Sequence, residues 1–221
     1  MLSPAIPLRS LSTLDPDKAR EEYDGLLLLS ATVASGLGAE LDAFLERAAS
    51  VDRSLGQTPR LLLAEGWPGS RIAHVPLKGL ADDFSDVRVF AEAAAVGAAM
   101  LEQAGARRIL LAISPGALPD NAYLRDRYRY AAELAYAGVC QALWQPREAR
   151  VSGHTATDRL DCLGVLAPGL PLDVQRAMAT EEGRSLARDL AGTDPESMAP
   201  PGFAELCEHA FAETPVVCSV Q

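Results

Sequence analysis

Short apolar runs alternate along this chain with longer stretches in which apolar residues recur at helical spacing. A continuous apolar run of about four to eight residues, bounded by turn residues, is typical of a strand buried on both faces of a sheet. Runs of this kind lie at residues 26–30, 60–64, 71–77, 108–113 and 160–166. The segment Trp67-Pro-Gly-Ser70 separates the second run from the third and predicts a hairpin turn between them.

Between the apolar runs, the pattern changes to that of an amphipathic helix. From Ala39 to Val51, for example, Leu41, Leu45 and Ala48 fall on one side of a helix and the charged residues fall elsewhere. The pattern predicts helices at residues 39–51, 86–104, 121–143, 171–191 and 200–213. Residues 1–22 contain three prolines and predict a strand or coil that leads into the domain. The segment Pro215–Val220 predicts a last strand with no later strand to pair with.

Strands that alternate with helices predict a three-layer α/β domain, in which helices flank a mixed sheet. The turn residues Pro168 and Gly169 mark the natural end of this domain. We therefore expect an α/β domain at residues 1–168, a connecting helix at 169–191, and the start of a second α/β domain at 192–221.

Composition and charge narrow the range of partners. The chain has 221 residues, of which 48% are hydrophobic and 23% charged, as in an ordinary globular protein. The formal net charge of -10 disfavours nucleic acid and anionic membranes, because contact with phosphates needs clustered lysine and arginine. No apolar stretch reaches transmembrane length, and the N-terminus lacks the pattern of a signal peptide. We therefore expect a cytoplasmic protein with neither nucleic-acid nor membrane partners.

Four cysteines stand among apolar neighbours and have no paired spacing such as C-x-x-C: Cys140, Cys162, Cys207 and Cys218. Cysteines of this kind behave as small buried hydrophobic residues. Reduced, buried cysteines suit the reducing environment of the cytosol.

The chain lacks a complete catalytic or metal-binding motif. His74, His154 and His209 are far apart, and none belongs to an H-x-x-x-H or H-E-x-x-H pair that would place two ligands on one helix face. Gly69-Ser70 lacks the G-x-S-x-G elbow that exposes a nucleophilic serine. We therefore assign no catalytic, cofactor-binding or metal-binding residue to this chain.

Two pairs of adjacent carboxylates, Asp82-Asp83 and Glu181-Glu182, have the charge to attract a cation. The first pair precedes a predicted helix, where acidic residues stabilise the positive end of the helix dipole. The second pair lies on a predicted helix, where adjacent side chains point in different directions. Both pairs are predicted to be solvated charges.

Two loops contain glycine and follow predicted strands. Gly36-Leu-Gly38 lacks the third glycine of the dinucleotide fingerprint, because Leu41 stands three positions after the second glycine. Ser114-Pro-Gly116 ends a buried strand, and its backbone amides could bind an anion. The loop Ser114–Pro119 is therefore the best candidate for a ligand pocket.

Segments spread over most of the chain resemble the N-terminal half of the leucyl aminopeptidase (M17) family in order and approximate spacing. The segments that carry the resemblance are Pro76-Leu-Lys-Gly-Leu80, Ala106-Arg-Arg-Ile-Leu-Leu111, Ala131–Gly138 before Trp144, Gly183–Leu190, which reads G-x-x-x-A-R-D-L, and Met198-Ala-Pro-Pro-Gly-Phe-Ala204. Many members carry an N-x-P-x-N segment at the hinge, whereas this chain has Gly192-Thr-Asp-Pro-Glu196. The difference indicates a divergent branch.

The resemblance implies a macro-like N-terminal domain followed by a catalytic domain that is truncated early. In the family, the catalytic domain holds two divalent metal ions, zinc or manganese, through a lysine and several carboxylates, and the enzyme assembles as a hexamer. No segment of this chain matches those metal ligands. The resemblance therefore implies the non-catalytic part of a metalloexopeptidase, inactive alone and serving oligomer assembly and shielding of the active site.

Two alternatives stay open at this point. The chain could be a free-standing macro-like module that binds a nucleotide such as ADP-ribose, with the Ser114–Pro119 loop as its phosphate cradle. It could also be an inactive regulatory partner that joins full-length aminopeptidase subunits.

Overall fold

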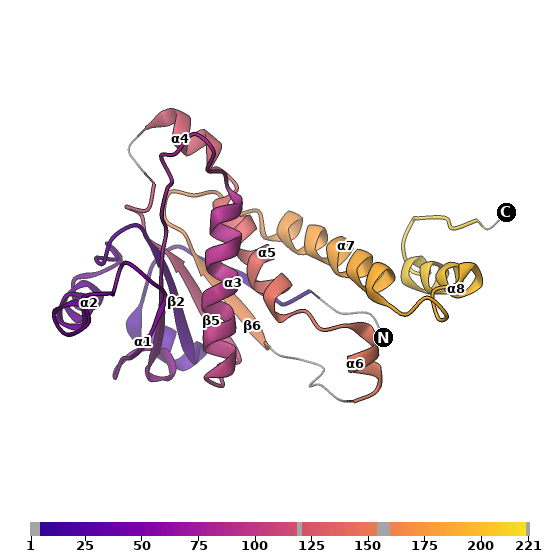
Figure 1. Ribbon diagram of the computed structural model, residues 1–221, viewed down its shortest axis with the longest axis horizontal. Coiled ribbons are helices and arrows are strands. Elements are labelled where there is room, and N and C mark those ends of the chain that lie inside the picture. The colour runs from indigo at the N-terminus through magenta and orange to yellow at the C-terminus, as the bar shows by residue number, and fades with distance from the viewer. Residues whose placement is uncertain (1–4, 119–120, 154–159, 220–221) are drawn as a thin grey trace. The chain divides into compact units, whose positions relative to one another are not determined.

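A computed structural model describes residues 5–118, 121–153 and 160–219 of the chain (Figure 1). The chain divides into two compact units. The larger unit comprises residues 6–143 and 158–178, and the smaller unit comprises residues 1–5, 144–157 and 179–221.

The larger unit is built on a six-stranded sheet with the strand order β1-β6-β5-β2-β4-β3. Its strands are β1 (Leu8–Leu11), β2 (Gly25–Ser30), β3 (Arg60–Leu63), β4 (Arg71–Pro76), β5 (Arg108–Ile113) and β6 (Cys162–Leu166). Neighbouring strands are parallel, except that β3 and β4 form an antiparallel hairpin across the 3-10 turn η1 (Pro68–Ser70). The predictions of a mixed sheet and of a hairpin at Trp67–Ser70 are therefore confirmed.

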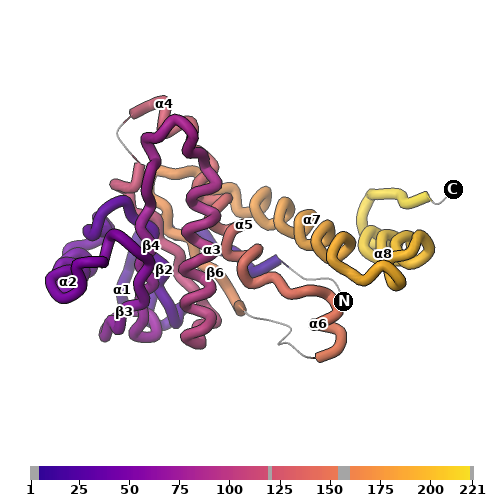
Figure 2. The backbone as a smooth tube through the Cα atoms, viewed as in Figure 1, coloured from indigo at the N-terminus to yellow at the C-terminus, as the bar shows by residue number. Residues whose placement is uncertain are grey.

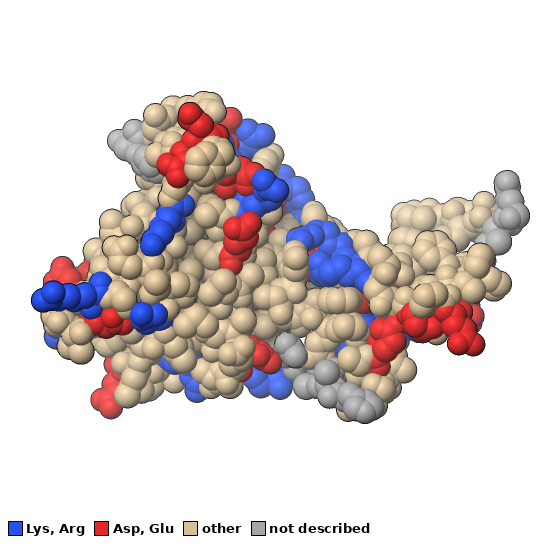
Figure 3. Space-filling model, in the orientation of Figure 1, with Lys and Arg blue, Asp and Glu red and all other residues tan. Residues whose placement is uncertain are grey.

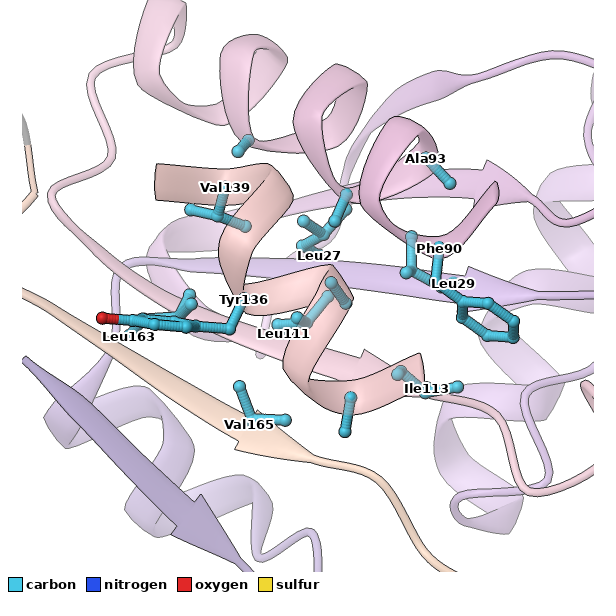
Figure 4. Close-up of a cluster of buried hydrophobic side chains, with 14 of the residues drawn as sticks. Leu27, Leu29, Phe90, Ala93, Leu111, Ile113, Tyr136, Val139, Leu163 and Val165 are labelled. Carbon is cyan, nitrogen blue, oxygen red and sulfur yellow. The ribbon is translucent and has the colours of Figure 1, made fainter. Parts of the chain in front are cut away.

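Helices cover both faces of this sheet, as predicted. The helices of the chain are α1 (Pro16–Glu22), α2 (Ala39–Val51), α3 (Arg88–Gln103), α4 (Ala122–Arg127), α5 (Ala131–Leu143), α6 (Arg147–Val151), α7 (Val174–Gly192) and α8 (Pro200–Phe211). One apolar cluster packs α3 and α5 against one face, where side chains such as Leu27, Leu111 and Val165 meet Phe90 and Val139 (Figure 4). A second apolar cluster packs α1 and α2 against the other face.

Helices α3 and α5 lie side by side along the sheet (Figure 2). Glycines make this close packing possible. A Cβ added to Gly138 on α5 would lie 2.1 Å from the carbonyl oxygen of Ala91 on α3. A Cβ added to Gly97 on α3 would lie 2.0 Å from the Leu27 side chain in the sheet below. The layers are therefore close enough that neither position has room for a side chain.

The helix predicted at residues 121–143 is wrong in one respect, because the structure divides it into α4 and α5. The break lies at Tyr128, which is buried and donates a hydrogen bond of 2.8 Å from its hydroxyl to the carbonyl oxygen of Leu80. The Tyr128 ring also packs against Phe90, with ring centroids 5.7 Å apart. The helix is therefore interrupted where the Tyr128 side chain makes these tertiary contacts, and the local helical pattern does not reveal them.

Two further segments differ from the predictions. The strand predicted at Pro215–Val220 is wrong, because residues 216–219 form no strand and Val217 is 89% exposed. An isolated apolar strand gains no ladder of hydrogen bonds without a neighbouring strand. The leading segment contains β1 and also the helix α1, whose N-cap Asp15 accepts hydrogen bonds from two amides and whose first position is Pro16. That Asp-Pro start signal was present in the sequence and was missed.

Candidate functional site

The carboxyl edge of the sheet brings together the two glycine-containing loops that follow β2 and β5. These strands are parallel neighbours, and the chain leaves β2 toward β4 but leaves β5 toward β6. Such a topological switch point is where open α/β sheets commonly bind ligands. A Cβ added to Gly36 would lie 3.5 Å from the side chain of Pro115, so the two loops meet here. The two segments that the sequence singled out therefore form one candidate site.

The loop after β2 is already hydrogen-bonded to a negatively charged side chain, the carboxylate of Asp42 on α2. One oxygen of this carboxylate accepts hydrogen bonds from the Ser35 amide at 2.5 Å, the Ser35 hydroxyl at 2.7 Å and the Gly36 amide at 3.1 Å. The Leu37 amide donates to the Ser35 hydroxyl at 3.1 Å. A phosphate at these amides would have to displace Asp42 and would meet its negative charge. Sequence reasoning missed Asp42, although an aspartate near the start of a predicted helix was a signal for it.

The loop after β5 is a tight turn beside the Ser35–Gly36 segment that is bonded to Asp42. Ser114 is 5% exposed, its amide donates to the Leu29 carbonyl at 2.9 Å, and its own carbonyl accepts from the Ala117 amide at 2.9 Å. Residues 119–120 lie outside the described part of the chain, so the candidate loop Ser114–Pro119 is described only as far as Leu118. Its described part is held by a hydrogen bond to the end of β2 and by the turn between Ser114 and Ala117.

A buried serine–histidine pair lies at the same side of the sheet. The Ser30 hydroxyl donates to the Thr32 carbonyl at 2.6 Å, and the Nε2 atom of His74 lies 2.9 Å from the same hydroxyl oxygen. Because that hydrogen is given to the carbonyl, the Nε2 atom of His74 acts as the donor to the Ser30 oxygen. Burial lowers the pKa of His74, which is fully buried. Its Nδ1 atom has no hydrogen-bond partner among the described residues.

This pair joins residues 44 positions apart in the sequence, which is why the sequence did not reveal it. Nucleophilic catalysis needs a serine whose proton is taken by the histidine and whose oxygen reaches a substrate. Ser30 gives its proton to a backbone carbonyl, and neither Ser30 nor His74 is exposed. The pair is therefore part of the packed interior and is not suited to catalysis.

Most other candidates occupy ordinary structural positions. Ser70 and Gly69 form the turn of the β3–β4 hairpin, and both have positive φ angles. Asp82 and Asp83 are exposed, as predicted, and their backbone carbonyls accept hydrogen bonds from the Arg127 guanidinium. His209 lies in the last turn of α8, whereas His154 lies outside the described residues.

The predicted burial of the four cysteines is confirmed for Cys140 alone. Cys162, Cys207 and Cys218 are half-buried, and none of the four forms a disulfide. Burial raises the pKa of the Cys162 thiol, which keeps it protonated and weakly nucleophilic.

The prediction of a solvated Glu181 is wrong. Glu181 is 1% exposed, and its carboxylate forms ion pairs with Arg184 at 3.2 Å and with Arg188. Glu182, the other member of the pair, is exposed as predicted. A buried carboxylate needs such partners, because removal from water strongly disfavours an unpaired charge.

The G-x-x-x-A-R-D-L segment contributes a buried polar network to the smaller unit. The Asp189 carboxylate is fully buried, accepts a hydrogen bond of 3.1 Å from the indole Nε1 of Trp144, and forms an ion pair with Arg150. The guanidinium of Arg188 lies 5.8 Å from the centre of the Trp144 ring, at a distance suited to a cation–π contact. The Arg-Asp of the motif therefore fastens α7 to the segment that begins at Trp144.

The described residues do not fit the metal site that the resemblance implies for a catalytic domain. Among them, no group of three or more His, Cys, Asp or Glu side chains could hold a metal ion. Charged residues of both signs are interspersed over the face seen in Figure 3. In the part of the chain that the structure describes, no helix combines the length and apolar character needed to cross a membrane.

Comparisons with known proteins point to one family. The chain is 31% identical over 214 residues to a probable cytosol aminopeptidase of Leifsonia xyli subsp. xyli (strain CTCB07). The match covers 91% of this chain but 36% of the relative, so the chain spans about a third of that protein's length. No profile of a protein family matches the chain.

Solved structures share the fold. A mutant of tomato leucine aminopeptidase matches with a TM-score of 0.66 at 20% identity, over 95% of this chain and 43% of that chain. The bottromycin maturation enzyme BotP in complex with Mn matches with a TM-score of 0.54 at 21% identity, over 86% of this chain and 36% of that chain. The chain thus has an α/β fold found in leucine aminopeptidases. It is a homologue of part of a cytosol aminopeptidase, which confirms the resemblance to the leucyl aminopeptidase (M17) family.

Proposed function

We propose that this chain is the N-terminal, non-catalytic portion of a leucyl-aminopeptidase-like metalloexopeptidase, an enzyme that releases N-terminal amino acids from peptides. The observation that carries the proposal is the 31% identity along 91% of the chain, to a relative of which the chain spans 36%. The fold shared with tomato leucine aminopeptidase over 95% of the chain supports it.

The organisation of the proposed protein has three parts. Residues 1–168 form the macro-like α/β domain, residues 169–191 the connecting helix, and residues 192–221 the start of the catalytic domain. The buried pairing of Asp189 with Arg150 supports a structural role for the connecting helix, because an ion pair held out of water depends strongly on its geometry.

The catalytic chemistry belongs to the remainder of such an enzyme. There, two divalent metal ions, zinc or manganese, would polarise the peptide carbonyl and activate water. This chain would help to assemble the oligomer, a hexamer in the family, and would shield the active site. The name of the Leifsonia relative, a cytosol aminopeptidase, supports placing the protein in the cytoplasm.

The proposal is tested by assaying the 221-residue chain on leucine p-nitroanilide with added zinc or manganese. The whole Leifsonia relative is the positive control. We expect no hydrolysis by the chain alone, because none of its described residues forms a metal-binding group. Metal-dependent hydrolysis by the purified chain would refute a non-catalytic role.

The assembly role requires a separate measurement. The chain is mixed with the remaining two-thirds of the Leifsonia relative, expressed without its matching part, and molar mass is measured by light scattering. We expect the two polypeptides to elute together as an oligomer with higher peptidase activity than the remainder alone. Separate elution with unchanged activity would contradict assembly and shielding.

The nucleotide-binding alternative rests on the switch point between β2 and β5, where the Gly36 and Ser114 loops meet. The Asp42 carboxylate argues against nucleotide binding, because this carboxylate already accepts hydrogen bonds from the loop amides of Ser35 and Gly36. Calorimetric titration with ADP-ribose distinguishes the two readings, with an Asp42→Asn variant as comparison. Binding by the unmodified chain would favour a macro-like binding module, whereas no heat from either protein would eliminate it.

A further inference from the structure

The helix α8 (Pro200–Phe211) has an apolar side that the described chain leaves in contact with water. Its apolar residues fall on one half of the helix surface: Phe203, Ala204, Leu206, Cys207, Ala210 and Phe211. The other half carries the polar residues Glu205, Glu208 and His209. A surface helix normally turns such an apolar side toward a core, yet no residue of α8 is buried, and Phe203 is 45% exposed.

The apolar side of α8 opens into a cavity of about 590 Å³ within the smaller unit. The cavity is lined by Met198 before the helix, by Phe203, Ala204 and Cys207 of the helix, and by Cys218 near the end of the described chain. We call the side chains of these five residues the α8 face. None of the residues that line the cavity is acidic or basic, so the α8 face suits an apolar occupant.

The α8 face lacks a covering element of its own. In the part of the chain that the structure describes, α8 packs extensively against no other helix or strand. Contiguous apolar surface that stays exposed marks a site of interaction with another protein surface.

The length of the related enzymes indicates what covers this face. The chain spans 36% of the Leifsonia relative and 43% of the tomato leucine aminopeptidase. More than half of each protein therefore has no counterpart in this chain. The α8 face includes three residues of the segment Met198–Ala204, which is one of the segments that carry the resemblance to these enzymes. The uncovered surface thus lies where the chain resembles the larger proteins.

We propose that the α8 face is covered by the part of the aminopeptidase that this chain does not match. Apolar side chains of that part fill the cavity and remove Phe203 and Cys207 from water. The inference rests on the proposed function and deepens it, because it names the surface through which the chain meets the remainder of the enzyme.

The cysteines of the chain report whether this face is covered. Cys207 and Cys218 belong to the α8 face, are half-buried and form no disulfide, so N-ethylmaleimide can alkylate them in the chain alone. Cys162 is also half-buried but lies on β6 in the larger unit, and it is the internal control.

The test compares the chain alone with a chimera in which the chain replaces its matching part of the Leifsonia relative. Mass spectrometry follows the alkylation of each cysteine, and hydrolysis of leucine p-nitroanilide verifies that the chimera is assembled. We expect alkylation of Cys207 and Cys218 to slow at least about tenfold in the chimera, whereas Cys162 keeps its rate.

The outcomes separate this inference from the proposed function. Unchanged alkylation of Cys207 and Cys218 in an active chimera would overturn the inference alone. A chimera without activity would count against the proposed function itself, and the inference would fall with it. If the chain alone were a dimer by light scattering with both cysteines already protected, the α8 face would belong to a second copy, which would also overturn the inference.

A variant of the exposed ring supplies a second measurement. Phe203→Glu should shift the Tm of the chain alone by no more than roughly 2 °C, because substitutions of exposed residues cost little. In the chimera it should lower the Tm by several degrees, because the new carboxylate would be buried without a partner. Glu205→Gln, on the exposed polar side of α8, is the matched control and should change neither Tm. Equal effects of Phe203→Glu on the chain and on the chimera would contradict the covering of this face.

Discussion

Replacement of Gly138 by alanine tests the close packing of α3 against α5. The added Cβ would lie 2.1 Å from the carbonyl oxygen, 2.6 Å from the Cα and 2.7 Å from the carbonyl carbon of Ala91. All three atoms belong to the backbone of α3, so no side-chain rotation relieves the contact. Because non-bonded carbon atoms pack at about 3.5–4.0 Å, the helices must separate by at least about 1 Å. Interiors packed to crystal density do not absorb such a shift freely.

The magnitude follows from two opposing effects. Overpacking a core costs typically about 1–3 kcal/mol, and a clash of the new methyl group with the backbone of α3 belongs at the upper end of that range. Alanine in place of glycine inside a helix returns about 1 kcal/mol through helix propensity. We therefore expect Gly138→Ala to lower the free energy of unfolding by about 2 kcal/mol. For a chain of this length, that loss lowers the Tm by roughly 4–8 °C.

Urea unfolding followed by circular dichroism measures this change, and Gly183→Ala provides the matched control. Gly183 lies inside α7, and a Cβ added to it would meet nothing within 4 Å. The same substitution there should raise stability by up to about 1 kcal/mol. If Gly138→Ala were as stable as the unmodified chain, the packing argument would be wrong.

Three further predictions concern charge and hydrogen bonding. Asp189→Asn should destabilise the protein by about 3–5 kcal/mol, because it removes the buried ion pair between Asp189 and Arg150, and thermal unfolding measures the loss. Stability should fall as the pH drops below about 6.5: the pKa of buried His74 is lowered, so the unfolded chain binds a proton that the folded chain does not. Urea unfolding at pH 7.5 and 5.5 tests this, and His74→Gln should remove that part of the slope. Asp42→Ala should remove the acceptor of the Gly36 amide, so that the hydrogen exchange of this amide, measured by NMR, becomes faster. Unchanged exchange would contradict the proposed role of the Asp42 carboxylate in holding this loop.

The local pattern of the chain was sufficient for its regular elements. The helix Ala39–Val51 and the strand Arg108–Ile113 match the predicted bounds, because periodicity and turn residues act over a few neighbouring positions. The hairpin at Trp67–Ser70 followed from the same local signals. The alternation of strands and helices also predicted the layered α/β class.

The candidate site depended on information that local patterns do not contain. Gly36 and Ser114 were recognised separately, but the strand order β5-β2 is what places their loops together. Asp42 was overlooked because it accepts hydrogen bonds from backbone amides six and seven positions earlier in the chain. Helical periodicity relates residues three and four positions apart and does not predict such bonds.

By itself, the sequence determined where strands and helices form, the α/β class, and the resemblance of its G-x-x-x-A-R-D-L segment to a family of aminopeptidases. The tertiary structure alone decided the sheet order, the break of the helix at Tyr128, the burial of Glu181 and the meeting of Ser30 with His74. The physical reason is the range of the interactions. Backbone conformation responds to neighbours a few positions apart, whereas burial and charge pairing depend on residues that only the folded chain brings within a few ångströms.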